Sequence, residues 1–163
     1  MKMKLILTCS AFFLLAMSAT AFSQRLYPVQ GPATAQVPPP LFTAKLANYQ
    51  GKSGKISLQQ VNGETFQGTW SVMTATFVNA KTVGSPAGYP PQPNLAYAWD
   101  AIYGPGYYVA TILGSENIGQ AIATGNHGTV LQIEFHRKQL GEPEDNHFGV
   151  AVDNKGNFYK VVL

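Results

Sequence analysis

Cysteine is almost missing from this chain. Its 163 residues include one, Cys9, in the N-terminal stretch. The rest of the chain therefore has no disulfide, no thiolate metal site and no cysteine nucleophile. We expect a fold that is held together by side-chain packing.

Charged residues are also scarce, at 12% of the chain. Lys2 and Lys4 belong to a predicted leader, and the remainder has nine basic residues against eight acidic ones, a formal charge of +1. No basic stripe is present, so the sequence argues against nucleic acid and anionic membrane surfaces as partners.

Motifs of known catalytic sites are missing as well. The chain has no G-x-S-x-G, S-x-x-K or H-E-x-x-H pattern, which are typical of hydrolases and zinc proteases. Glu134 and His136 share one face of a predicted strand, but a metal site needs three or four convergent ligands. The sequence thus predicts no catalytic residue, no metal and no cofactor.

The first 21 residues have the pattern of a secretory signal peptide. Two lysines precede an apolar stretch, Leu5 to Met17, and residues 19–21 are the small residues that signal peptidase requires. The stretch is shorter than the ~20 residues of a membrane-spanning helix, so no stable membrane insertion is expected. We expect cleavage before Phe22, or alternatively after Ser23, and export to the periplasm or beyond the cell.

Proline dominates the next segment, residues 22–40, which ends in Pro38-Pro39-Pro40. Proline removes amide donors and restricts the residue before it, so this segment is predicted to be an extended linker. The folded domain is then expected over residues 41–163, a length sufficient for one core.

Alternating apolar and polar residues predict strands through most of residues 41–163. The pattern is clearest where Leu131, Ile133 and Phe135 alternate with polar residues. Further strands are expected at 41–48, 54–60, 65–74, 107–113, 118–124 and in two segments near the C-terminus. No βαβ alternation occurs, so the expected fold is all-β and mainly antiparallel, either a small barrel or a two-layer sandwich.

Two glycines have predicted roles in these strands. Asn62-Gly63 is typical of a tight hairpin turn between the strands at 54–60 and 65–74. Gly68 shares a strand face with Phe66 and Trp70, which predicts either a bulge or a close approach over a ring.

One segment departs from the strand pattern. Residues 94–103 are predicted to form a short helical insertion that Asn94 caps and Gly104-Pro105-Gly106 ends. A proline-rich loop with a possible functional role precedes it, within residues 76–96. The candidate ligand-binding residues are Tyr97, Trp99, Asp100, Tyr103 and Tyr108. Their rings either line a pocket or plug one end of the barrel as part of its core.

Three patterns in the last 65 residues carry a resemblance. They are Trp99-Asp100-x-x-Tyr103-Gly104-x-Gly106-Tyr107, Gly125-x-x-Gly128-Thr129-Val130-Leu131 and Gly149-Val150-Ala151-x-Asp153-Asn154-x-Gly156-x-x-Tyr159. In these the chain resembles a group of small exported bacterial proteins of unknown function, many of them lipoproteins. The resemblance implies a β-rich envelope protein and transfers no activity. Cys9 lies near the start of the apolar stretch instead of at its end, so lipidation of this chain is not expected.

The expected function is that of an exported cell-envelope protein, a non-enzymatic binding or structural module whose partner is an unidentified protein or a small apolar ligand. One alternative is a small-ligand-binding β-barrel that uses the aromatic cluster at 97–108. A second alternative is a hydrolase whose site the sequence does not reveal. The sequence specifies no oligomeric state.

Overall fold

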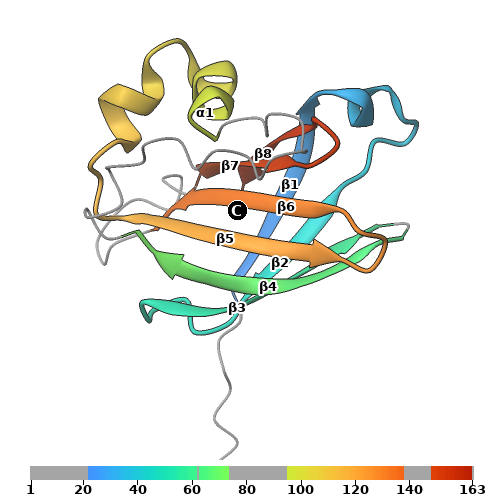
Figure 1. Cartoon of the computed structure of the whole chain (residues 1–163), viewed down its shortest axis with the longest axis horizontal. Helices are drawn as coiled ribbons and strands as arrows, with labels where there is room; N and C mark the ends of the chain where they lie inside the picture. The colour runs from blue at the N-terminus through green and yellow to red at the C-terminus, as the bar shows by residue number, and fades with distance from the viewer. Residues whose placement is uncertain (1–21, 62, 74–94, 138–147, 163) are drawn as a thin grey trace, which may run out of the picture.

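Eight antiparallel strands form a closed barrel in the computed structural model, which describes residues 22–61, 63–73, 95–137 and 148–162 (Figure 1). Each strand pairs with the next along the chain, and the last pairs with the first. The strands are β1 (Phe22–Gln30), β2 (Phe42–Leu46), β3 (Ser53–Gln60), β4 (Thr65–Val72), β5 (Ile118–Gly125), β6 (Val130–His136), β7 (Phe148–Asp153) and β8 (Phe158–Val162). The predicted all-β fold is confirmed in its barrel form, since pairing of β1 with β8 leaves no open sandwich edge.

Strand β1 lies in the segment that was predicted to be a linker, and that prediction is wrong for residues 22–30. Gln24 and Leu26 are buried while Ser23 and Arg25 are exposed, the period of two that a barrel strand requires. The ladder with β8 is irregular between Pro28 and Gln30, where proline supplies no amide donor. The barrel therefore includes residues 22–30, because β1 closes the gap between β2 and β8.

Some predictions fall on residues outside the described ranges. These are the signal peptide at 1–21, Asn62 in the β3–β4 hairpin turn, and most of the proline-rich loop, which lies within residues 74–94. The hairpin itself is confirmed, since β3 and β4 pair from Ser53 with Ser71 to Gln59 with Thr65. Within the described ranges, no helix has the length and apolarity that a membrane crossing requires.

Large rings and very small residues alternate around the barrel interior. Phe135 on β6 lies over Gly119 on β5, where any Cβ would meet the ring. The ring of Phe42 meets those of Phe66 and Tyr159 edge to face, with centroids 5.5 and 5.3 Å apart. Ala121, Ala123 and Ala151 on β5 and β7 are buried among these rings. Side chains therefore fill the interior, as small eight-stranded barrels allow.

Gly68 lets two strands approach closely. A Cβ there would collide with the carbonyl oxygen of Ile122 and with Cα of Ala123 on β5. The β4–β5 register runs without a break from Phe66–Gly125 to Val72–Gly119. The predicted bulge is therefore wrong, and the close approach is to strand backbone instead of a ring.

We expect Gly68→Ala to lower the free energy of unfolding by about 1–3 kcal/mol, because an added methyl group has to push β4 and β5 apart. The matched control is Gly63→Ala, where an added Cβ has no neighbour within 4 Å. Urea unfolding of both variants measures the difference. Equal stabilities would show that the strands separate at no cost.

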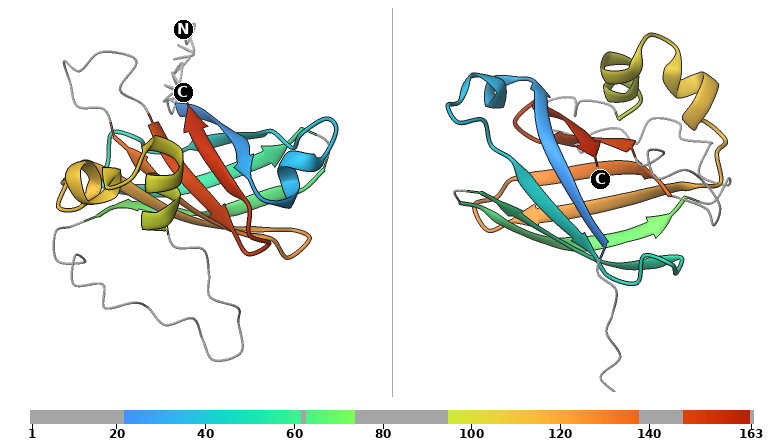
Figure 2. Two further views of the ribbon diagram at one scale, coloured as in Figure 1. Left: turned by 90° about the horizontal axis from the view of Figure 1, so that it is seen from above. Right: turned by 180° about the vertical axis from the view of Figure 1, so that it is seen from behind.

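A smaller layer lies outside the barrel over β6, β7 and β8 (Figure 2). It consists of helix α1 (Leu95–Tyr103) and a π-helical turn, η3 (Tyr108–Ile112). The helix is confirmed, and it ends where Gly104 takes a φ of 115°. The strand predicted at 107–113 is wrong: the closed barrel has no free edge to extend, and Ile112 instead packs with Trp99 and Val150 in an outer cluster.

Candidate functional site

The five candidate ligand-binding residues lie on α1 and η3, against the outer wall of the barrel. Ala98 and Trp99 face that wall and are fully buried, whereas Tyr97 is 56% exposed. Their neighbours beneath the helix are outward-facing residues of the strands, Val150, Val152 and Phe158. The helix therefore does not plug a barrel end, and the predicted placement of its rings in the barrel core is wrong. They form a second core on the outside.

Trp99 is tied to a buried carboxylate. Its Nε1 donates a hydrogen bond of 2.7 Å to Oε2 of Glu134, and Gln120 Nε2 donates one of 2.7 Å to Oε1. Glu134 points outward from β6, as its alternation predicted, but α1 covers it and leaves it 3% exposed. Hydrogen bonds to a charged acceptor are stronger than neutral ones, so this contact anchors α1 to the barrel.

Half-buried rings extend from Trp99 toward the surface. Tyr103 and Tyr107 stack with centroids 5.1 Å apart, and Tyr107 stacks on Trp99 at 6.0 Å. Phe148, at the start of β7, meets Trp99 edge to face with ring centroids 5.8 Å apart. The ring of His136 stacks on the ring of Phe148 with centroids 5.2 Å apart. We call these five residues the ring cluster. Their mutual contacts combine apolar burial with favourable aromatic geometry.

Asp100 and Tyr108 join the helix to the turn that follows it. Asp100 Oδ1 accepts a hydrogen bond of 2.8 Å from the backbone amide of Tyr108. The Tyr108 side chain packs at the edge of the outer cluster, where burial and the charge of Glu134 raise its pKa. Asp100 thus supports the backbone of η3, a structural contact.

His136 has one polar atom without a partner. Its Nδ1 is buried and makes no hydrogen bond in the part of the chain that the structure describes. Both oxygens of Glu134, its predicted neighbour, are taken by Trp99 and Gln120. Among the described residues no three His, Cys, Asp or Glu side chains are grouped to hold a metal ion. The nitrogen remains a hydrogen-bonding group at the rim of the ring cluster.

Tyr103 carries a perturbed phenol. Burial, the largest cause, and the neighbouring Tyr107 raise its pKa to about 12, and its hydroxyl donates a hydrogen bond of 3.2 Å to the carbonyl oxygen of Gly149. The unfolded chain ionises near pH 10, so the folded state favours the neutral phenol. Its contribution to stability is present below pH 10 and is lost as pH rises toward 12.

We expect Tyr103→Phe to weaken this alkaline loss of stability. The free energy of unfolding, measured by urea titration from pH 8 to 11.5, should fall less steeply above pH 10 than in the unchanged protein. Tyr97→Phe, at an exposed position of the same helix, should keep the original slope. Identical slopes for all three proteins would contradict the assignment to Tyr103.

An arginine covers one end of the barrel. Arg137, directly after β6, donates hydrogen bonds of 3.0 and 2.7 Å to the carbonyl oxygens of Tyr49 and Gly51. Its guanidinium lies 5.4 Å from the ring centroid of Trp70, whose Nε1 donates 2.9 Å to the carbonyl oxygen of Ala47. These contacts bind the β2–β3 connection across this end.

Two buried carboxylates organise the other end. Glu64 accepts hydrogen bonds from the Thr129 hydroxyl at 2.6 Å and from the amides of His127 and Thr129 at 3.0 and 3.2 Å. Asp153, 2% exposed, accepts from the Tyr159 hydroxyl at 2.9 Å and from Asn157 Nδ2 at 2.8 Å. Burial and the charge of Asp153 raise the pKa of Tyr159. The networks lock the turns between β5 and β6 and between β7 and β8.

Sequence reasoning considered Glu134 only as a metal ligand and missed its buried contact with Trp99, and it missed Phe148, Arg137 and Glu64. One usable signal exists for the first two. Strand β7 reads FGVAVD and is apolar on both faces, which is typical of a strand covered on both sides. That pattern predicts a cover over the outer face of β7, with Phe148 beneath it. No local pattern marks the other two residues, whose partners are distant in sequence.

The chain matches no protein-family model, no curated protein and no solved structure.

Proposed function

We propose that the protein is an exported, non-enzymatic module of the cell envelope that binds or scaffolds through its outer surface. The observation that carries the proposal is the filled barrel, with Arg137 bound across one end and the Glu64 and Asp153 networks at the other. A barrel of this size holds either packed side chains or one small ligand. Here side chains fill it, which leaves the outer wall as the surface for recognition.

Export rests on the predicted signal peptide, and the position of β1 supports cleavage before Phe22. A cut there leaves β1 whole, whereas a cut after Ser23 removes Phe22, whose ring stacks on Tyr49 at 4.1 Å. We expect the full chain, expressed in a bacterium, to yield an exported form whose N-terminal sequence begins Phe22-Ser23-Gln24. Cytoplasmic protein that retains residues 1–21 would contradict export.

The non-enzymatic character is tested separately. Purified residues 22–163 are assayed with generic ester, phosphate-ester, glycoside and peptide substrates, and no turnover above buffer is expected. Glu64→Gln and Glu134→Gln remove two buried carboxylates, one bound by Thr129 and the other by Trp99 and Gln120. Turnover that either substitution abolishes would replace this proposal with the hydrolase alternative.

A second candidate function is small-ligand binding at the ring cluster. It is favoured by the half-buried Tyr103–Tyr107 stack together with the unpartnered Nδ1 of His136. An apolar aromatic ligand such as naphthalene is expected to quench Trp99 fluorescence. Trp99→Phe leaves Trp70, buried inside the barrel, as the control emitter that should not respond. A flat response across a panel of apolar ligands rejects this candidate.

A further inference from the structure

The outer faces of β3, β4 and β5 form one continuous polar surface. Strand pairing places Lys55, Thr69 and Ile122 in one row, and places Ser53, Ser71 and Gln120 in the next. We call this surface the polar wall. Its residues are Ser53, Lys55, Ser57, Gln59, Thr65, Gln67, Thr69, Ser71, Gln120, Ile122 and Thr124.

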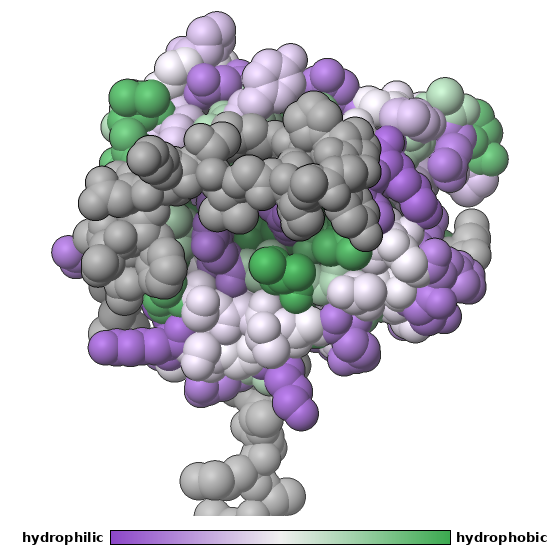
Figure 3. All heavy atoms as spheres, in the orientation of Figure 1, coloured by the Kyte–Doolittle hydropathy of each residue, from purple (hydrophilic) through white to green (hydrophobic). Residues whose placement is uncertain are grey.

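The wall is nearly free of charge. Lys55 is the one charged residue among its eleven, whereas soluble protein surfaces are designed with roughly 25–35% charged side chains. Figure 3, which looks onto β4 and β5, shows side chains of intermediate hydropathy around a small apolar patch. Hydroxyl and carboxamide groups replace the usual mixture of charges.

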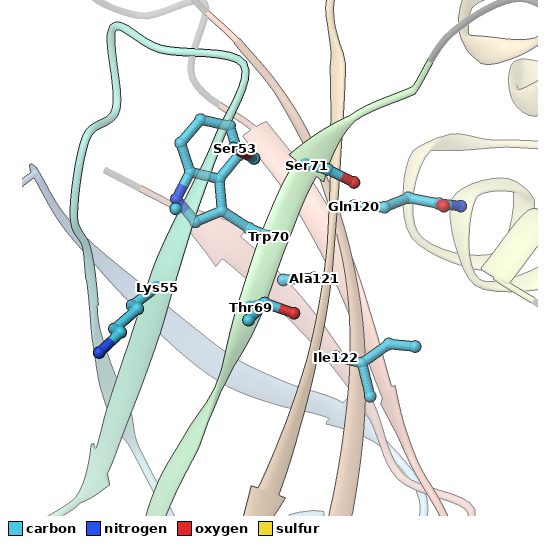
Figure 4. Close-up of a pocket in the computed structure, with 9 residues that line it drawn as sticks. Ser53, Lys55, Thr69, Trp70, Ser71, Gln120, Ala121 and Ile122 are labelled. Carbon is cyan, nitrogen blue, oxygen red and sulfur yellow. The ribbon is translucent and has the colours of Figure 1, made fainter.

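The wall is hollowed toward the end where Ser53, Ser71 and Gln120 form its last row. A groove of about 510 Å³ is lined by Ser53, Lys55, Thr69, Ser71, Gln120 and Ile122. In Figure 4 the side chains of Thr69, Ser71 and Ile122 project to one side of their strands, while Trp70 projects to the other. The volume is within the range of ligand sites, roughly 300–1,000 Å³.

Most side chains of the wall make no hydrogen bond to the described part of the protein, and the sheet backbone fixes their spacing. Within the described part of the chain, Gln120 is the one wall residue whose side chain bonds to protein, through Glu134. The β3–β4 and β4–β5 registers run without a break, so the wall groups are spaced by a rigid sheet. A surface that is ordered before binding loses less conformational entropy when the ligand binds.

The chemistry of the wall selects a class of partner. Hydroxyl and carboxamide groups both donate and accept hydrogen bonds, as sugar hydroxyls do, and Ile122, 60% exposed, offers an apolar contact for a sugar ring. A neutral ligand requires no opposite charge. Protein interfaces instead favour aromatic residues and arginine and disfavour serine, and nucleic acid requires clustered cations.

We propose that the polar wall binds an uncharged polysaccharide chain. The inference rests on the proposed function, since it names the partner class of the outer surface. The ligand lies in the groove across β4 and β5, where Thr69, Ser71 and Gln120 hydrogen-bond its hydroxyls and Ile122 packs against a ring face.

The test is affinity electrophoresis of residues 22–163 in native gels that contain dextran, laminarin or hydroxyethylcellulose. At least one polymer is expected to retard the protein. Thr69→Glu and Ile122→Glu should weaken that retardation by about tenfold or more, because a neutral ligand leaves the buried carboxylate unpaired. Gln30→Glu makes the same change of charge at an exposed position of β1 and should bind normally.

Thr69→Val keeps the shape of the side chain and removes only the hydroxyl, so it tests the inference if a charged variant fails to fold. It should weaken retardation by a few-fold. No retardation by any polymer, or retardation that the wall variants leave unchanged, would overturn the inference. A dimer in solution that Ile122→Glu dissociates would also overturn it, yet would leave an outer-surface binding module in place. Release of new reducing ends from a polymer would instead contradict the non-enzymatic function.

Discussion

Trp99→Ala is expected to lower the free energy of unfolding by about 3–5 kcal/mol, the range for removing a buried tryptophan. The indole is fully buried and contacts Tyr103, Tyr107 and Phe148. Its loss also leaves Oε2 of Glu134 buried without its donor, which adds an unsatisfied acceptor to the cavity. Guanidinium unfolding followed by circular dichroism measures the effect.

Tyr97→Ala is the matched control on the same helix. Its side chain is 56% exposed and rests on Phe158 at 5.7 Å, so we expect a cost below about 1 kcal/mol. Trp99→Phe keeps a smaller ring and removes the donor. Made in the unchanged protein and again in a Glu134→Leu background, it should cost about 1–3 kcal/mol more when Glu134 is present, since the loss of ring volume is common to both. A Trp99→Ala protein as stable as the Tyr97→Ala protein would show that α1 is not anchored through Trp99.

Glu64→Ala is expected to cost about 2–4 kcal/mol at pH 7. Three donors, the Thr129 hydroxyl and the amides of His127 and Thr129, lose their acceptor, and Thr129 is only 3% exposed. Buried donors without a partner cost about 1–3 kcal/mol each. Equilibrium unfolding in urea at pH 7 measures the difference.

The same carboxylate makes the free energy of unfolding depend on pH in the acidic range. Burial alone would raise the pKa of Glu64, but the hydrogen bonds from Thr129 and His127 and the charge of Lys155 lower it overall. A lowered pKa stabilises the fold above the unfolded value near 4.3, and this contribution is lost as pH falls through the folded value. Glu64→Gln should therefore lose less stability than the unchanged protein between pH 5 and pH 2.

Glu116→Gln is the control for that pH series, because Glu116 lies exposed between η3 and β5. It should follow the unchanged protein throughout. If Glu64→Gln also follows it, the acid response originates at other carboxyl groups.

Strand patterns were predictable wherever a segment has one face in the barrel core and one face in solvent. The alternation of Leu131, Ile133 and Phe135 placed β6 correctly, and Asn62-Gly63 indicated the β3–β4 hairpin. The same rule assigned Glu134 to solvent, since a single strand carries no information about what lies over its outer face. Helix α1 covers that position, and its Trp99 is 35 residues from Glu134 in the sequence.

The errors at residues 22–30 and 107–113 have one cause. Both were judged from local composition: proline argued against a strand in the first, and aromatic and β-branched residues argued for one in the second. Barrel closure decided both cases. β1 is needed between β2 and β8, where its backbone finds two partners, and no edge then remains for residues 107–113 to join.

The sequence by itself determined the all-β class, the helical insertion and a core without disulfides, because periodicity and composition act over neighbouring residues. Only the tertiary structure decided that the barrel is closed and filled, and that the aromatic helix lies on its outer wall beside Glu134. The physical reason is that burial and hydrogen-bond satisfaction depend on which distant segments meet. The polar wall across β3, β4 and β5, with Lys55 as its one charge, emerged in the same way, since strand register brings its scattered serines, threonines and glutamines together.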